Sequence, residues 1–133
     1  MARATSKKER GVVIGLIRDV FFGITVRNTI RRLNFEAQII KTVDELPSAI
    51  AVYEPDLVII DLNLLTEDDA EWQPIKNALA GGARVLAFGP HMDVEKMRAA
   101  KDAGVTRTIS NSQFHRNMAE LIERYALPAD AGT

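Results

Sequence analysis

The nine residues 55–63, PDLVIIDLN, place a carboxylate at a position where chemistry is often found. Residues 57–60 are all apolar, which predicts a strand that is buried on both faces. Asp61 follows directly, so its carboxylate should stand where this strand opens into a loop. In that position a carboxylate either marks the exit of the strand or is a site where a group is attached or bound. The rest of the sequence has to distinguish these two interpretations.

The composition indicates one domain and excludes several kinds of site. The chain has 133 residues and a net charge of −1, with 47% hydrophobic and 26% charged residues. The lack of cysteine excludes disulfides, thiol catalysis and thiolate metal sites. No apolar run reaches the roughly 18 residues that span a bilayer. We therefore expect a cytoplasmic domain without membrane contact, and the near-neutral charge argues against direct nucleic-acid binding.

Strand-length apolar runs alternate along the chain with segments of helical spacing. The predicted strands cover residues 12–17, 35–40, 57–61, 85–88 and 106–109. The predicted helices cover residues 22–33, 42–53, 66–79, 93–104 and 111–125. We expect Asn111 or Ser112 to cap a single last helix. This alternation predicts an α/β fold in which a parallel sheet is covered by helices on both faces.

Polar or small residues follow several of these strands. In a parallel sheet of this kind, ligands bind beyond the carboxyl ends of the strands. The residues expected at that edge are Arg18, Asp19, Asp61, Gly89 and Asn111. We expect residues 1–10 to form a flexible basic arm, residues 11–127 the domain and residues 128–133 a disordered tail.

The order, length and spacing of the elements resemble a response-regulator receiver domain of two-component signalling. The segment 97–105, MRAAKDAGV, is similar to a receiver segment that ends in an Ala-Gly pair. The resemblance implies a flavodoxin-like sheet of five parallel strands in the order 2-1-3-4-5. It places Asp61 where receivers carry the aspartate that accepts a phosphoryl group. It places Asn63 where a backbone carbonyl helps to hold Mg²⁺.

Other positions depart from the receiver pattern. The acidic pair after the first strand of a receiver falls here on Ile17 and Arg18, with Asp19 one residue late. The hydroxyl residue that ends the fourth strand falls on Gly89, and the lysine that ends the fifth falls on Asn111.

These departures predict a degenerate or pseudo-receiver that is not an enzyme and needs no cofactor. The missing groups would stabilise charge on a transferring phosphoryl group. Each such loss raises the activation barrier of phosphoryl transfer by roughly 3 kcal/mol. Mg²⁺ is expected only if Asp61 is a working phosphoacceptor, with Asp19 and Asp61 as weak metal candidates. We predict instead that Asp61 hydrogen-bonds a loop amide or pairs with Arg18, which would then occupy the place of the metal.

If phosphoryl transfer is lost, the function that the resemblance still implies is contact with other proteins. Receivers commonly pair through their fourth helix, fifth strand and fifth helix, which here should show charges of both signs: Glu95, Arg98, Lys101, Asp102, Arg107, Glu120 and Arg124. Mixed charges suit a two-fold homodimer and equally suit an ordinary solvated surface. We therefore expect a signal-transduction domain with protein partners.

Two alternatives stay open. One is a functional receiver that is phosphorylated on Asp61. The other is a small-molecule or nucleotide-binding flavodoxin-like module with a pocket around Asp61 and Gly89, because Gly89 has no side chain and should leave space. The length leaves no room for a DNA-binding output domain, so we expect either a stand-alone adaptor or a fragment of a longer protein.

Overall fold

The computed structural model describes residues 10–90 and 93–127. The predicted tail and all of the predicted arm before Arg10 lie outside this part of the chain. Arg10 itself is held by the domain. Its guanidinium donates to the Leu33 carbonyl at 3.2 Å and pairs with the Glu123 carboxylate at 2.8 Å. It also lies 5.4 Å from the centre of the Phe35 ring, a cation–π contact.

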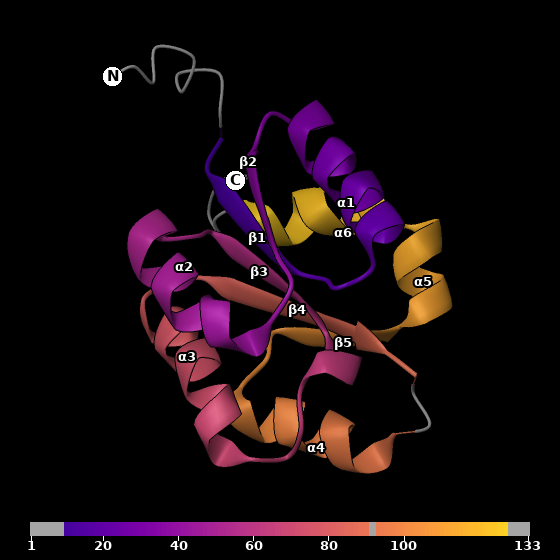
Figure 1. Cartoon of the computed structure of the whole chain (residues 1–133). Coiled ribbons are helices and arrows are strands. Elements are labelled where there is room, and N and C mark those ends of the chain that lie inside the picture. Colours follow the sequence, from indigo (N-terminus) through magenta and orange to yellow (C-terminus); the bar gives the residue numbers. More distant parts are fainter. Residues whose placement is uncertain (1–9, 91–92, 128–133) are drawn as a thin grey trace.

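Five parallel strands form one sheet in the order β2-β1-β3-β4-β5, which confirms the predicted flavodoxin-like topology (Figure 1). The strands are β1 (Val12–Leu16), β2 (Glu36–Ile40), β3 (Leu57–Asp61), β4 (Arg84–Gly89) and β5 (Arg107–Ser110). The central β3 is buried on both faces, as its apolar run predicts. Its last residue, Asp61, pairs with Phe88 of β4, so both strands end at the same edge of the sheet.

Helices cover both faces of the sheet (Figure 1). One face carries α2 (Leu46–Tyr53), α3 (Asp69–Ala80) and α4 (Val94–Ala103), and the other carries α1 (Val20–Arg32), α5 (Asn111–Arg116) and α6 (Met118–Ala126). Two short 3₁₀ turns, η2 (Val43–Glu45) and η3 (Leu62–Leu64), precede α2 and follow β3. Within the described residues, no helix is long and apolar enough to cross a membrane.

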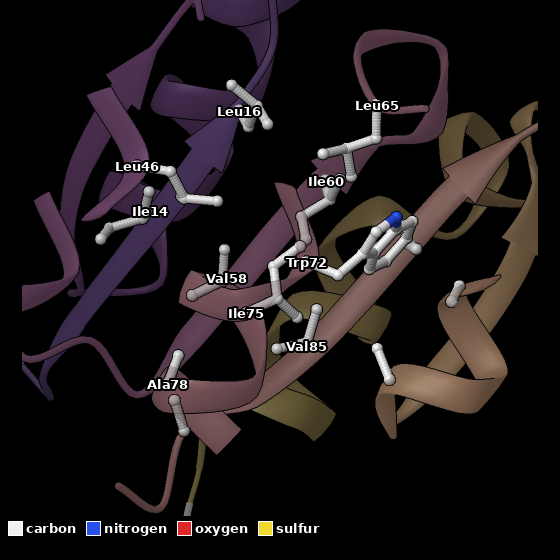
Figure 2. Close-up of a cluster of buried hydrophobic side chains, with 14 of the residues drawn as sticks. Ile14, Leu16, Leu46, Val58, Ile60, Leu65, Trp72, Ile75, Ala78 and Val85 are labelled. Atoms are coloured by element: carbon white, nitrogen blue, oxygen red, sulfur yellow. The ribbon is translucent and has the colours of Figure 1, made fainter. Parts of the chain in front are cut away.

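The alternation of side chains along the strands divides the hydrophobic core into two halves. On the face of α2, α3 and α4, Val58 and Ile60 of β3 pack near Trp72 and Ile75 of α3 (Figure 2). The Trp72 indole N–H is satisfied by the Thr66 carbonyl at 2.7 Å. On the other face, alternate residues of the same strands pack against α1, α5 and α6: Val13, Leu57, Ile59, Leu86 and Phe88.

The prediction of a single last helix is wrong. The chain forms two helices, α5 and α6, which are separated at Asn117, where φ is −118°. The cap of α5 is Ser110, whose Oγ accepts from the Gln113 amide at 3.1 Å, and Asn111 is already helical. The change of direction at Asn117 allows both Phe114 of α5 and Ile122 of α6 to be fully buried.

Candidate functional site

Asp61 ends β3 and starts η3. Its carboxylate Oδ1 accepts a hydrogen bond from the backbone amide of Asn63 at 2.9 Å, so it caps the 3₁₀ turn that follows. The prediction that Asp61 hydrogen-bonds a loop amide is therefore confirmed. Part of the carboxylate's accepting capacity is used to hold its own loop.

The environment of Asp61 disfavours its charged form. Burial raises the pKa of the Asp61 carboxyl above its ordinary value, because desolvation penalises the anion. The hydrogen bonding of Asn63 opposes this pKa shift first, and the charges of Lys96 and Arg18 oppose it more weakly. In the described part of the chain no ion pair joins Arg18 to Asp61, and Arg18 is exposed. The predicted direct pairing of Arg18 with Asp61 is therefore wrong.

The raised pKa of Asp61 makes its charge a cost to the fold at neutral pH. A carboxyl whose pKa rises on folding stabilises the fold below its unfolded pKa, and that contribution is lost as the pH rises through the folded pKa. Asp61→Asn keeps an oxygen that accepts from the Asn63 amide and removes the charge. We expect the variant to have a higher free energy of unfolding than the wild type at pH 7 and to lose that advantage at pH 3. Urea titrations at both pH values measure it.

The exposed Asp102 supplies the matched control for this prediction. Asp102→Asn removes the same charge from a solvated helix face, so we expect little change in the free energy of unfolding. An Asp61→Asn effect that is the same at pH 3 and pH 7 would contradict the pKa argument.

The positions expected after β1 carry groups that serve the fold. Ile17 is 1% exposed and belongs to the core. Asp19 is the N-cap of α1, and its Oδ1 accepts from the Phe22 amide at 2.9 Å. This cap starts α1 at Val20, two residues before the predicted start. Because Asp19 is used as a cap, it forms no ion pair with its sequence neighbour Arg18 in the described part of the chain.

The space beside Gly89 is occupied. A Cβ built on Gly89 would lie 3.0 Å from the Leu62 Cβ, which is closer than most real contacts, and 3.4 Å from the Leu62 Cδ1. Leu62 is 1% exposed and follows Asp61 directly. The expectation that Gly89 leaves room for a ligand is therefore wrong, because Leu62 fills the volume that a larger residue would need.

The end of β5 carries hydroxyl and amide groups. Ser110 ends the strand opposite Gly89 of β4. Its Oγ lies 3.4 Å from that of Ser112 and caps α5. Asn111, at the position of the receiver lysine, is exposed on the first turn of that helix.

The comparisons with known proteins bear on the fold. No protein-family model matches the sequence, and no curated protein matches it. Among solved structures, a CheY-like receiver domain protein from Methanospirillum hungatei JF-1 matches with a TM-score of 0.73 at 16% identity, over 87% of this chain and 93% of that one. The chemotaxis protein CheY4 of Vibrio cholerae matches with a TM-score of 0.70 at 14% identity, over 86% of this chain and 98% of that one.

The chain has the receiver fold. A third neighbour, HP1043, an orphan response regulator of H. pylori, agrees with a TM-score of 0.68 at 14% identity, over 88% of this chain and 94% of that one. Asp61 stands at the end of the third strand of the receiver fold, where the resemblance predicts the phosphoacceptor.

The residues at this edge of the receiver fold do not fit a magnesium ion. Mg²⁺ prefers near-octahedral oxygen ligands, usually carboxylates and water. The described residues contain no cluster of three His, Cys, Asp or Glu side chains that could hold a metal. Asp61 offers one partly engaged carboxylate, and that of Asp19 caps α1. The resemblance implied the Asn63 carbonyl as a further ligand. A Mg²⁺ ion at this carbonyl would therefore find few other oxygen ligands.

Two residues of this site were missed by the sequence reasoning. Lys96 lies in the first turn of α4, where its charge lowers the pKa of Asp61 more than that of Arg18 does. Its place after β4 could have indicated this, because loops after parallel strands meet at one edge. The position of Leu62 could not be predicted from the sequence, because no local pattern shows that this side chain fills the space beside Gly89.

The predicted partner face is divided between two hollows and an isolated ion pair. Arg98, Lys101 and Arg107 line a groove of about 420 Å³ between α4 and β5. Glu95 and Asp102 line another hollow, between α3 and α4, which Arg98 also borders. On α6, Glu120 and Arg124 pair with each other at 3.6 Å.

Arg107 also connects β5 to α6. Its guanidinium donates to the Tyr125 hydroxyl at 3.1 Å, and this hydrogen bond lowers the pKa of Tyr125.

Proposed function

We propose that this chain is a receiver-fold signalling domain that acts through contact with protein partners, without phosphoryl transfer to Asp61. The observation that carries the proposal is the packing of Leu62 into the space beside Gly89, where a receiver needs a hydroxyl and a bound phosphoryl group. A hydroxyl-bearing residue at position 89 would therefore have to displace Leu62 before it could bind a phosphoryl group on Asp61.

The charges around Asp61 support the same proposal. Phosphoryl transfer depends on positively charged groups and metal ions that stabilise the transferring oxygens. Here the acidic positions hold Ile17 and Arg18, and the lysine position holds the exposed Asn111. Lys96 acts on Asp61 by charge, but its ammonium is also 3.9 Å from the Asp93 carboxylate. These residues therefore provide little of the stabilisation that transfer requires.

The partner contact that we propose uses the groove between α4 and β5. Arg98, Lys101 and Arg107 make this groove basic, and Val94 beside it is 63% exposed. A homodimer through α4, β5 and the C-terminal helices is one form of such contact, because the wider face carries charges of both signs.

The test of the proposal is a titration with Mg²⁺ and beryllofluoride, a mimic of the phosphoryl group, followed through backbone amide chemical shifts. We expect no saturable shifts at Asp61, Asn63 or Gly89. The Asp61→Asn variant is the matched control, since it cannot bind beryllofluoride as a carboxylate does. Saturable shifts around Asp61 that are absent in Asp61→Asn would overturn the proposal and indicate a working phosphoacceptor.

A further inference from the structure

We define the α1–β2 flank as Val20, Ile24, Arg27, Ile39 and Lys41. This flank exposes apolar side chains to solvent. Of the five large apolar side chains that are exposed among the described residues, three lie in the first two turns of α1. Phe21 is 82% exposed, Val20 53% and Ile24 41%. Apolar residues that gather on one surface often indicate an interaction site.

A cavity of about 330 Å³ opens on this flank. Ile17, Gly23 and Ile39 contribute apolar surface to it, and Arg27 and Lys41 contribute positive charge. The one acid that borders it, Asp19, is already used as the cap of α1. The cavity therefore combines apolar walls with two cations and one acid, so its lining carries a net positive charge.

The guanidinium of Arg27 is partly buried beside this cavity. Its Nε is buried and has no hydrogen-bond partner in the described part of the chain, where no carboxylate pairs with Arg27 either. A buried donor without an acceptor is costly, and a charged one more so. A carboxylate that enters the cavity would pair with the charge of the Arg27 guanidinium.

The neighbouring strand β2 presents an open edge of the sheet (Figure 1). The Glu36 amide donates to the Gly11 carbonyl, and the Ile40 carbonyl accepts from the Ile17 amide, so both residues face β1. Because these directions alternate along a strand in a parallel sheet, the backbone N–H and C=O groups of Ala37 and Ile39 face away from the sheet. Such an edge is a template for another strand.

We infer that the α1–β2 flank binds an extended, acidic segment of a partner protein, which adds to the sheet as a strand beside β2. Backbone hydrogen bonds to Ala37 and Ile39 would hold the segment. One apolar side chain would enter the cavity beside Ile24, and a carboxylate would pair with Arg27 or Lys41. The inference rests on the proposed function, to which it adds a partner class, and it uses the opposite edge of the sheet from β5.

Charge favours this occupant over two others. The first nine residues of the chain contain three basic residues and one acid, so they would be repelled by Arg27 and Lys41. A second copy that paired β2 with β2 about a two-fold axis would bring two α1 helices together. The net positive flank of one copy would then lie beside that of the other, so like charges would oppose the pairing.

The test uses the full chain and a blocked hexapeptide, Val-Val-Glu-Glu-Val-Val, in an amide chemical-shift titration. In this peptide each face of a strand presents one carboxylate between two valines, whichever face turns towards α1. We expect saturable shifts at Ala37, Ile39 and Ile24 at millimolar peptide. Arg27→Gln should weaken binding by about tenfold, as the loss of a charge-assisted hydrogen bond predicts. Arg31→Gln, on the last turn of the same helix and outside the cavity, should change it less than about twofold.

A second peptide, Val-Val-Lys-Lys-Val-Val, distinguishes binding that depends on the carboxylates from strand addition that does not depend on charge. We expect no shifts from this basic peptide. The inference is overturned if the acidic peptide leaves Ala37 and Ile39 unchanged, if both peptides act alike, or if Arg31→Gln weakens binding as much as Arg27→Gln. Concentration-dependent changes at Ala37 and Ile39 without peptide would also overturn it, because a second copy would then cover the edge. None of these outcomes alters the beryllofluoride result, so the proposed function is tested separately.

Discussion

Replacement of Phe114 by alanine should lower the free energy of unfolding by about 3–5 kcal/mol, because it empties a fully buried position. Phe114 stacks on Phe88 of β4 with ring centres 4.6 Å apart and meets the edge of Phe22 of α1 at 5.9 Å. These three rings connect α5, β4 and α1 beside the candidate site. Urea unfolding followed by circular dichroism measures the change.

Phe21→Ala is the matched control, since it removes the same side chain from a position that is 82% exposed. We expect a change within about 0.5 kcal/mol. If the two variants unfold at similar urea concentrations, the ring cluster does not have the structural role assigned to it. His115, which stacks on Phe22 with centres 4.3 Å apart, should show a shifted ring resonance in Phe114→Ala if the cluster rearranges.

The second large effect concerns Leu62 and Gly89. Gly89→Ala should lower the free energy of unfolding by about 1–3 kcal/mol, because the new methyl group would lie 3.0 Å from the Leu62 Cβ. Leu62→Ala alone should cost about 2–5 kcal/mol as a buried truncation. The double variant should be more stable than the sum predicts, by roughly 0.5–2 kcal/mol, because the branches of Leu62 no longer hinder the shift that alanine requires.

Gly23→Ala shows whether the cost at residue 89 comes from crowding. A Cβ on Gly23 would lie 3.4 Å from the nearest atom of Ile39, an ordinary contact, within helix α1. We therefore expect alanine there to stabilise the protein by about 0.5–1 kcal/mol. Additive effects of Gly89→Ala and Leu62→Ala would show that the outer carbons of Leu62 do not hinder residue 89, so that only the Cβ that alanine retains crowds it.

These two predictions bear on function, because both concern the edge at which a receiver performs its chemistry. A threonine or serine at residue 89 would place its Cβ 3.0 Å from the Leu62 Cβ, so restoring the hydroxyl group would require Leu62 to shift. The ring cluster keeps α1 and α5 packed beside that edge. This edge of the sheet therefore contains packed apolar side chains next to the partly exposed Asp61.

The sequence by itself determined the parallel α/β architecture and the place of Asp61 at a strand end, and the resemblance to receivers added the sheet order. Helical and strand periodicity are local, and parallel α/β units follow few connection rules, so segments such as 57–60 and 93–104 were sufficient for the architecture. The capping of η3 by Asp61 was also predictable, because both partners lie within three residues.

Only the tertiary structure decided what surrounds Asp61. The contact of Leu62 with Gly89, the charge of Lys96 and the separation of Arg18 from Asp61 depend on distances between segments that are far apart in the chain. The break at Asn117 and the open edge of β2 beside Arg27 likewise follow from how helices and strands pack. Residue types and spacing could mark an aspartate for phosphorylation, but side chains from other elements determine whether space and charge permit it.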